Sequence, residues 1–209
     1  MKRIKVLLCL LIIGLLTFGQ KVDTVINNDV LTSHFSYKTH TPLFVVYTLY
    51  HGGGDCSRTA MVFETGDIKN SATENDYYKS GYDKGHLCNA EDFSYDCDKE
   101  LNTFFYYNAL PQKPNLNRGC WKKIETKVRN QSQDDSLLII CGGFGFSNKI
   151  GNTSVPDYCF KIIKNLKTFK IESYLFTNTD KSTYDEIEIN HLLDNIPFAN
   201  NIKKILNLK

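Results

Sequence analysis

The sequence lacks any apolar stretch long enough to cross a membrane as a helix. Its longest apolar run, Val6–Leu16, has eleven residues, whereas a spanning helix needs about 20. Lys2, Arg3 and Lys5 precede this run, and the small residues of Thr17-Phe18-Gly19 follow it. This order predicts a secretory signal peptide over residues 1–20 rather than a membrane anchor. Cys9 lies inside the run and not at its end, which disfavours a lipoprotein signal.

The sequence also lacks a large excess of positive charge. The whole chain has a formal charge of +2, and cleavage after residue 20 removes three basic residues and no acidic ones. The mature chain then carries 22 Lys and Arg against 23 Asp and Glu. A protein that holds nucleic acid stoichiometrically usually shows a basic surface, whereas an enzyme that releases its product does not need one. From the predicted signal peptide we expect a secreted or periplasmic protein with no stable membrane association after cleavage.

No repeat, low-complexity segment or Ser/Pro/Gly linker divides the mature chain. Its length of 209 residues and its hydrophobic fraction of 42% suit one domain with a buried core. We expect this domain over residues 42–209, preceded by a loosely ordered segment over residues 21–41. Six cysteines remain after cleavage, and an even number in an exported chain predicts disulfide bonds. Six cysteines allow 15 pairings, among which the sequence does not choose.

Residue patterns predict more strands than helices, with no regular alternation between them. Runs of β-branched, aromatic and apolar residues predict strands at Pro42–Tyr50, Arg58–Glu64, Tyr106–Leu110, Leu137–Cys141, Cys159–Ile163 and Thr168–Phe176. Helical spacing or capping predicts helices at Asp98–Phe105 with Asp98 as the cap, Arg118–Asn130 and Tyr184–Leu193. Residues 65–80 are expected to form a polar loop. The fold class that follows is α+β with a mainly antiparallel sheet.

The stretch from Tyr82 to Arg129 holds the groups needed for metal-assisted attack on a phosphate. His86 is a competent base near physiological pH, and Asp83 can fix its tautomer or the turn that presents it. Asn117 offers a neutral oxygen to a hard cation such as Mg²⁺, which retains several waters when protein ligands are few. Glu125 can hold one of those waters. Arg129 follows Glu125 by four residues, so that both lie on one helix face.

Each of these residues also has a simpler interpretation. A histidine in a glycine-containing turn is more often structural or exposed than catalytic. Asn117 can cap the helix that follows it. Glu125 and Arg129 can form an ordinary surface ion pair worth a few tenths of a kcal/mol. Taken singly, none of them would establish a function.

Their combination resembles a known family. Asp83-Lys84-Gly85-His86, then Asn108 to Gln112, then Leu116-Asn117-Arg118-Gly119 with Glu125 and Arg129 behind it resembles the signature of the DNA/RNA non-specific endonucleases. These are secreted ββα-metal nucleases with an Asp-Arg-Gly-His motif. The resemblance is strong over these central residues and weaker at its edges, Pro42 and Phe198. It implies an antiparallel sheet flanked by helices, with a catalytic core of the His-Me finger type.

The resemblance also implies roles for individual positions. His86 falls on the general base, Asn117 on the single protein ligand to Mg²⁺ and Glu125 on the residue that orients metal-bound water. Arg58 and Arg129 fall on arginines that stabilise the phosphate, and Asn108 on an asparagine that supports the site. The charged motif residues Lys84 and Arg118 are expected to bind substrate. Lys84 replaces the hallmark arginine, which keeps the charge but loses a planar two-pronged donor; we expect activity with an altered rate or substrate preference.

The function expected is a secreted, Mg²⁺-dependent endonuclease that cuts DNA and RNA without sequence specificity, with Mn²⁺ or another divalent cation as a possible substitute. One alternative is a catalytically weak or inactive nucleic-acid-binding protein on the same scaffold. Another is a structural zinc module built on His86, Cys88 and Cys97. Their spacing fits none of the familiar paired-cysteine zinc patterns well, and export favours oxidation of the thiols.

Overall fold

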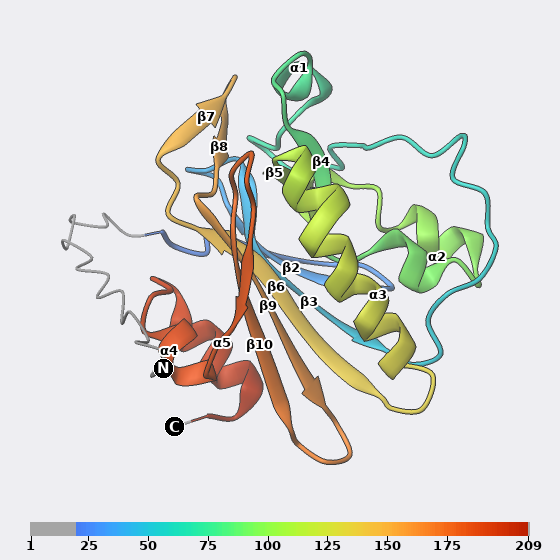
Figure 1. Cartoon of the computed structure of the whole chain (residues 1–209). Coiled ribbons are helices and arrows are strands. Elements are labelled where there is room, and N and C mark those ends of the chain that lie inside the picture. Colours follow the sequence, from blue (N-terminus) through green and yellow to red (C-terminus); the bar gives the residue numbers. More distant parts are fainter. Residues whose placement is uncertain (1–19, 209) are drawn as a thin grey trace, which may run out of the picture.

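The fold is built around one antiparallel sheet of seven strands (Figure 1). It is seen in a computed structural model that describes residues 20–208, so that the predicted signal peptide lies outside the described residues except for Gln20. In spatial order the strands are β1 (Thr24–Asn27), β2 (Thr32–Ser36), β3 (Thr41–Leu49), β6 (Leu137–Phe144), β9 (Tyr158–Asn165), β10 (Ile171–Thr177) and β11 (Tyr184–Glu186). Every neighbouring pair is antiparallel, which confirms the predicted fold class.

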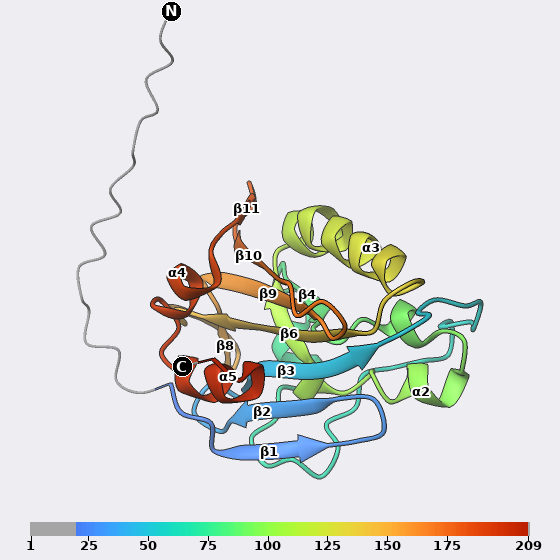
Figure 2. The same ribbon diagram turned by 90° about the horizontal axis from the view of Figure 1, so that it is seen from below.

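Both faces of the sheet are covered, and this explains why its central strands read as unbroken apolar runs. Along β6, Ile139 and Cys141 belong to one buried cluster, which includes Trp121, Ile124 and Val128 of the chain before and within α3 (Lys122–Gln131). Ile140 points the other way, into a cluster with residues of α4 (Ile189–Leu193) and α5 (Ala199–Leu206). Figure 2 shows α3 and α5 on opposite sides of the strands.

Trp121 fixes the start of α3 on the sheet. Its side chain is fully buried and meets the ring of Phe176 edge to face, with ring centroids 5.0 Å apart. Removing a buried tryptophan of this kind costs about 3–5 kcal/mol of stability. The apolar face of this helix, which carries the predicted site residues, is therefore packed on the sheet. Its polar face points away from the sheet, toward other segments.

Two small ribbons and several short helices complete the fold. The ribbon β4 (Asp83–His86) and β5 (Ala109–Gln112) is antiparallel, and β7 (Asn148–Ile150) pairs with β8 (Thr153–Val155). The short helices are α1 (Glu74–Tyr77) and α2 (Cys97–Leu101), and the short 3-10 turns are η1 (Ala90–Phe93) and η2 (Tyr106–Asn108). No helix within residues 20–208 is long and apolar enough to cross a membrane.

The segment over residues 21–41 is not loosely ordered, contrary to the sequence-based expectation. It contributes β1 and β2, and β2 pairs with β3 along the sheet. The residues of β1 alternate between half-buried and exposed, as suits an edge strand with one face toward water. Its polar composition reflects that single covered face and not a lack of structure.

Three other local predictions are wrong or only partly right. Arg58–Glu64 is not a strand, and within it only Glu64 makes a bridge, to Phe105. Tyr184–Leu193 is not one helix, because its first residues pair with β10 as β11 and the helix begins only at Ile189. The predicted strand Tyr106–Leu110 begins as the turn η2 and becomes β5 at Ala109.

The cap of α2 also differs from the prediction. Asp96, not Asp98, caps this helix, since its carboxylate accepts hydrogen bonds from the backbone N–H groups of Asp98 and Lys99. The predicted loop over residues 65–80 contains the short helix α1. The strands predicted at Pro42–Tyr50, Leu137–Cys141 and Cys159–Ile163 correspond to β3, β6 and β9.

Candidate active site

The ribbon of β4 and β5 presents His86. Gly85 is needed beside it because a Cβ at this position would lie 2.2 Å from Oε1 of the fully buried Gln112, closer than atoms can approach. The sequence pattern Gly-His therefore reflects the close packing of a neighbouring side chain on the ribbon. His86 stands at the end of β4, opposite Ala109.

The imidazole of His86 lies between two aromatic rings. Its centroid is 4.6 Å from that of Phe63 and 4.7 Å from that of Phe104. Its Nε2 is buried and has no hydrogen-bond partner among residues 20–208. Burial, and to a smaller extent the charge of Arg58, lower the pKa of His86 to about 3. The ring is therefore neutral at physiological pH, as a proton acceptor must be.

Asn108 holds the chain that follows His86. Its Oδ1 accepts a hydrogen bond from the backbone N–H of Cys88 at 2.8 Å, and its Nδ2 donates to the carbonyl oxygens of Cys88 and Thr103, also at 2.8 Å. Asn108 is fully buried and does not reach the cleft described below. It supports the site through the backbone.

Asn117 lies in the π-helical turn η3 (Leu116–Trp121), which leads into α3. Its Nδ2 donates to Oδ2 of Asp83 at 2.9 Å. Asn117 is not the cap residue of η3 or of α3, because these caps are Asn115 and Trp121. Arg118 binds the same carboxylate through two hydrogen bonds of 2.8 and 2.6 Å. Burial raises the pKa of Asp83, but the hydrogen bonds from Arg118 and Asn117 outweigh it and hold that pKa below its usual range. Asp83 thus orients Asn117, and among the described residues no hydrogen bond joins it to His86.

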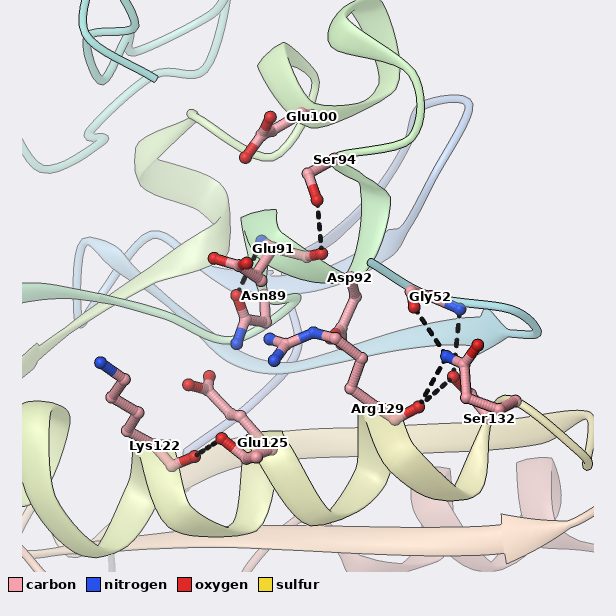
Figure 3. A network of polar contacts seen from close by, with 12 residues as sticks. Gly52, Asn89, Glu91, Asp92, Ser94, Glu100, Lys122, Glu125, Arg129 and Ser132 are labelled. Atoms are coloured by element: carbon pink, nitrogen blue, oxygen red, sulfur yellow. Dashed lines mark hydrogen bonds and ion pairs between the residues drawn. The ribbon is translucent and has the colours of Figure 1, made fainter. Parts of the chain in front are cut away.

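Glu125 and Arg129 face the same side of α3 but do not form a surface pair. Arg129 Nε donates to Oδ1 of the fully buried Asp92 at 3.1 Å, and the Tyr47 hydroxyl donates to Oδ2 of Asp92 at 3.1 Å. Burial raises the pKa of Asp92 to about 6. Figure 3 shows the side chains of Glu125 and Arg129 projecting from the helix toward the turn that carries Asn89 and Asp92.

Glu125 is almost buried, with 8% of its surface exposed. Burial raises its pKa to about 7, against the opposing effect of the nearby Lys161. A carboxyl group that changes its charge near neutral pH beside a cleft is a candidate for a functional group.

Arg58 is brought to the site by a disulfide bond. Cys56 pairs with Cys97 of α2, with Cα atoms 5.5 Å apart. Two residues later, Arg58 binds Glu91 at 2.8 Å and lies 3.5 Å from Glu100. The disulfide is one of the 15 possible pairings, and the cysteines that remain as free thiols in the described chain are Cys88, Cys120, Cys141 and Cys159.

These elements enclose a cleft of about 520 Å³. His86 and Asn117, which are 31 positions apart in the sequence, both line it. The other predicted residues that it brings together are Arg58, Arg118, Glu125 and Arg129. It is also lined by four residues that the sequence did not predict: Asn89, Glu91, Lys122 and Thr126. Four of the lining side chains are basic and two are acidic. The positive charge that the whole chain lacks is thus concentrated locally.

Lys84 is not among the residues that line the cleft. Its Nζ binds Glu74 Oε2 at 2.5 Å and lies 5.6 Å from the centroid of the Phe63 ring. The expected substrate-binding role of Lys84 therefore has no support in its position, because the acidic first turn of α1 neutralises its charge.

The zinc module is contradicted. Cys97 is bonded to Cys56, and residues 20–208 contain no group of three or more His, Cys, Asp or Glu side chains that could hold a metal ion. A cation in the cleft would instead depend on few protein ligands. Asn117 could be such a ligand, because its amide nitrogen donates to Asp83 and its carbonyl oxygen stays available.

Comparisons with known proteins agree on one family. The family model described as DNA/RNA non-specific endonuclease matches residues 14–205. Bovine mitochondrial endonuclease G is 32% identical over 111 residues, which cover 51% of this chain and 37% of that protein. A nuclease of Nostoc is 34% identical over 90 residues, which cover 42% of this chain and 33% of that protein. The matched segments thus span about a third of these relatives.

A solved structure shows the same fold. A chain of the crystal structure of the EndoG/EndoGI complex, which describes the mechanism of EndoG inhibition, superimposes on this chain with a TM-score of 0.72. The match covers 91% of this chain and 86% of that chain at 19% identity.

Proposed function

The chain belongs to the DNA/RNA non-specific endonuclease family, and from that membership we propose that it hydrolyses phosphodiester bonds in DNA and RNA without sequence specificity. We further propose export through the N-terminal segment and a requirement for a divalent cation, Mg²⁺ or in its place Mn²⁺. The observation that carries the proposal is the convergence of a neutral imidazole and an oriented amide oxygen on one basic cleft, at His86 and Asn117.

His86 is the proposed general base. Its neutral ring accepts a proton from the attacking water as the new oxygen–phosphorus bond forms and the bond to the leaving oxygen breaks. An anionic phosphate in the cleft would stabilise the imidazolium and so oppose the burial that lowers the pKa of free His86. The contacts of Phe63 and Phe104 hold the ring in place, so that little motion is needed before proton transfer.

The residues fit a hard divalent cation. Asn117 would hold it through its carbonyl oxygen, and Glu125 would orient water beside it. A single neutral ligand leaves most of the coordination to water, which Mg²⁺ retains readily. When bound, the cation neutralises charge on the phosphate and on the leaving oxygen.

The basic side chains of the cleft bind the charged parts of the substrate. Arg58 and Arg129 are each anchored by a carboxylate, Glu91 and Asp92 respectively. Such anchoring fixes the direction of the guanidinium groups and lowers the entropy that a flexible side chain would lose on binding phosphate. Contacts to phosphate carry no base information, which agrees with cutting at many sequences.

The second candidate is a nucleic-acid-binding protein that does not cut. The complete set of base, amide oxygen and arginines in one cleft favours the enzyme. Purified mature protein incubated with supercoiled plasmid and with single-stranded RNA separates the two. We expect nicked, linear and then fragmented DNA and shortened RNA in Mg²⁺, arrest by EDTA, and recovery when Mg²⁺ or Mn²⁺ is added back.

Each other outcome of this assay has a clear meaning. Cleavage that persists in EDTA would contradict the metal requirement. A shift of the plasmid in a gel without any cleavage, across a series of divalent metals, would favour the binding protein. Asn117→Ala serves as a matched variant, because it should raise the metal concentration needed for half-maximal rate while leaving the fold intact.

A further inference from the structure

A lysine is buried in the middle of the sheet. Lys161 lies on β9, opposite Cys141 on β6, and its side chain is completely inaccessible to solvent. Lysine is almost never fully buried unless its charge is paired. Within residues 20–208 its Nζ has no hydrogen-bond partner, so that the groups around it must account for its presence.

Two groups meet the ammonium of Lys161. Its Nζ lies 3.8 Å from Oε1 of Glu125 and 4.3 Å from the centroid of the Trp121 ring. The indole face can stabilise a cation where water is excluded. Glu125 is the carboxylate that forms an ion pair with Lys161 among the described residues. Lys161 thus contacts Glu125, the one acidic side chain of α3, which also lines the cleft.

We propose that Lys161 is a positioning residue that favours the ionised form of Glu125 and directs its carboxylate toward the cleft, although Lys161 itself never touches the substrate. A carboxylate that orients water must accept hydrogen bonds, and a protonated Glu125 would offer one acceptor fewer and a donor in its place. The consequence for catalysis rests on the proposed nuclease function. The electrostatic coupling between Lys161 and Glu125 is independent of that function.

The charges around Glu125 show why a countercharge is needed. Burial raises the pKa of Glu125, and the opposing effect of Lys161 comes next in size, ahead of the further rise caused by Asp92 and the decrease caused by Arg129. The titratable and charged side chains that interact with Glu125, from α3 and from every element packed against it, are Lys161, Asp92, Arg129, Tyr47, Cys88 and Cys141. Arg129 forms its ion pair with Asp92, whereas Lys161 is the cation that forms an ion pair with Glu125 among the described residues.

The decisive measurement is the titration of the Glu125 carboxyl carbon by ¹³C NMR, which does not require nuclease activity. In Lys161→Met, which keeps an unbranched side chain one atom shorter and removes the charge, we expect the midpoint of Glu125 to move to higher pH by one unit or more. Lys161→Arg should return it toward the parental value. Lys164→Met is the matched control, because the Nζ of Lys164 donates instead to the carbonyl of Leu206, the last residue of α5, and this variant should leave the midpoint unchanged.

Activity supplies a second readout. The acidic limb of the pH profile of kcat/KM should move in Lys161→Met in the same direction as the Glu125 midpoint. A midpoint that does not move in Lys161→Met overturns the proposal, whatever happens to the rate. If the parental protein cuts no nucleic acid, the proposed function fails, and the NMR titration still decides whether Lys161 controls Glu125.

A double variant covers the case in which Lys161→Met does not fold. Breaking a buried ion pair leaves one charge uncompensated, whereas removing both partners is much better tolerated. The pair Glu125→Gln with Lys161→Met should therefore melt at a higher temperature than Lys161→Met alone. If the double variant is no more stable than the single one, Lys161 has a packing role only and the proposal is wrong.

Discussion

Asp83 and Asn117 meet side chain to side chain, with the amide nitrogen donating to the carboxylate at 2.9 Å across 34 positions of sequence. This contact fixes which end of the Asn117 amide is free. Asp83 thereby orients the proposed metal ligand, and among the described residues no hydrogen bond joins it to His86, the base whose tautomer it was expected to fix.

The first prediction concerns this contact. Asp83→Ala should raise the divalent-metal concentration for half-maximal cleavage about 10–100-fold, because partners that orient a ligand typically contribute that much to metal affinity. Arg118→Ala is the matched control, since it removes the other partner of Asp83 and keeps the bond to Asn117. It should weaken substrate binding while the metal dependence stays the same. An identical metal dependence in parent and Asp83→Ala would contradict the orienting role.

The second prediction concerns the base. His86→Ala should reduce the initial rate of plasmid nicking about 10²–10⁴-fold, the usual contribution of a general base. Thermal unfolding followed by circular dichroism should show that the variant still folds. His191→Ala, which changes an exposed histidine on α4, should cut at the parental rate. Cutting by His86→Ala within a few-fold of the parent would remove His86 from the mechanism.

The third prediction concerns the disulfide. Cys56→Ser with Cys97→Ser should raise KM several-fold more than it lowers kcat, because the bond fixes the loop that carries Arg58. The cross-link closes a loop of 41 positions, which in the chain-entropy model stabilises the fold by about 4 kcal/mol. A reducing agent should affect the parent in the same way and leave the double variant unchanged. An unaltered KM after reduction would show that Arg58 is held by its carboxylates alone.

The fourth prediction concerns pH and stability. The pKa of His86 is about 3 in the folded protein and near its usual value of about 6.5 after unfolding. Below pH 6.5 the unfolded chain therefore binds a proton that the folded chain does not, and this histidine costs stability as pH falls. His86→Ala removes that cost. Its stability relative to the parent should improve by about 1.4 kcal/mol per pH unit between pH 6 and 4.5.

Comparing the two proteins isolates this histidine. Burial lowers the pKa of His34 to about 4 and raises those of Glu125 and Asp92 to about 7 and 6. These groups contribute equally to parent and variant, so that their opposing effects cancel in the difference. Urea unfolding at each pH measures this difference in the free energy of unfolding between the parent and His86→Ala. A constant difference across this range would mean that His86 is protonated in the folded protein.

The fifth prediction concerns the departure from the hallmark motif. Lys84→Arg should change the cleavage rate and the ratio of DNA to RNA cutting by less than about threefold, because Lys84 binds Glu74 and does not line the cleft. This differs from the expectation that the residue alters rate or preference. Glu74→Gln serves as a second test, since freeing the Lys84 ammonium should also have little effect. A large gain in either variant would place this lysine at the substrate.

The parts of the fold that the sequence predicted share a local signal. The strands around Val45, Ile140 and Ile162 are continuous apolar runs because helices cover both faces of the sheet. The spacing of Trp121, Ile124 and Val128 marks the buried face of α3. Where the signal depended on distant partners the prediction failed. At β1, for example, the edge position in the sheet leaves one face of the strand exposed.

The sequence by itself determined the residue types of the site and the periodicity that puts Glu125 and Arg129 on one helix face. Only the tertiary structure decided their partners: Asp92 for Arg129, Lys161 for Glu125, and Cys97 among all the possible partners of Cys56. The physical reason is that periodicity is set by neighbours a few residues apart, whereas a buried charge is paired by whichever group the packing of the sheet and α3 brings within reach.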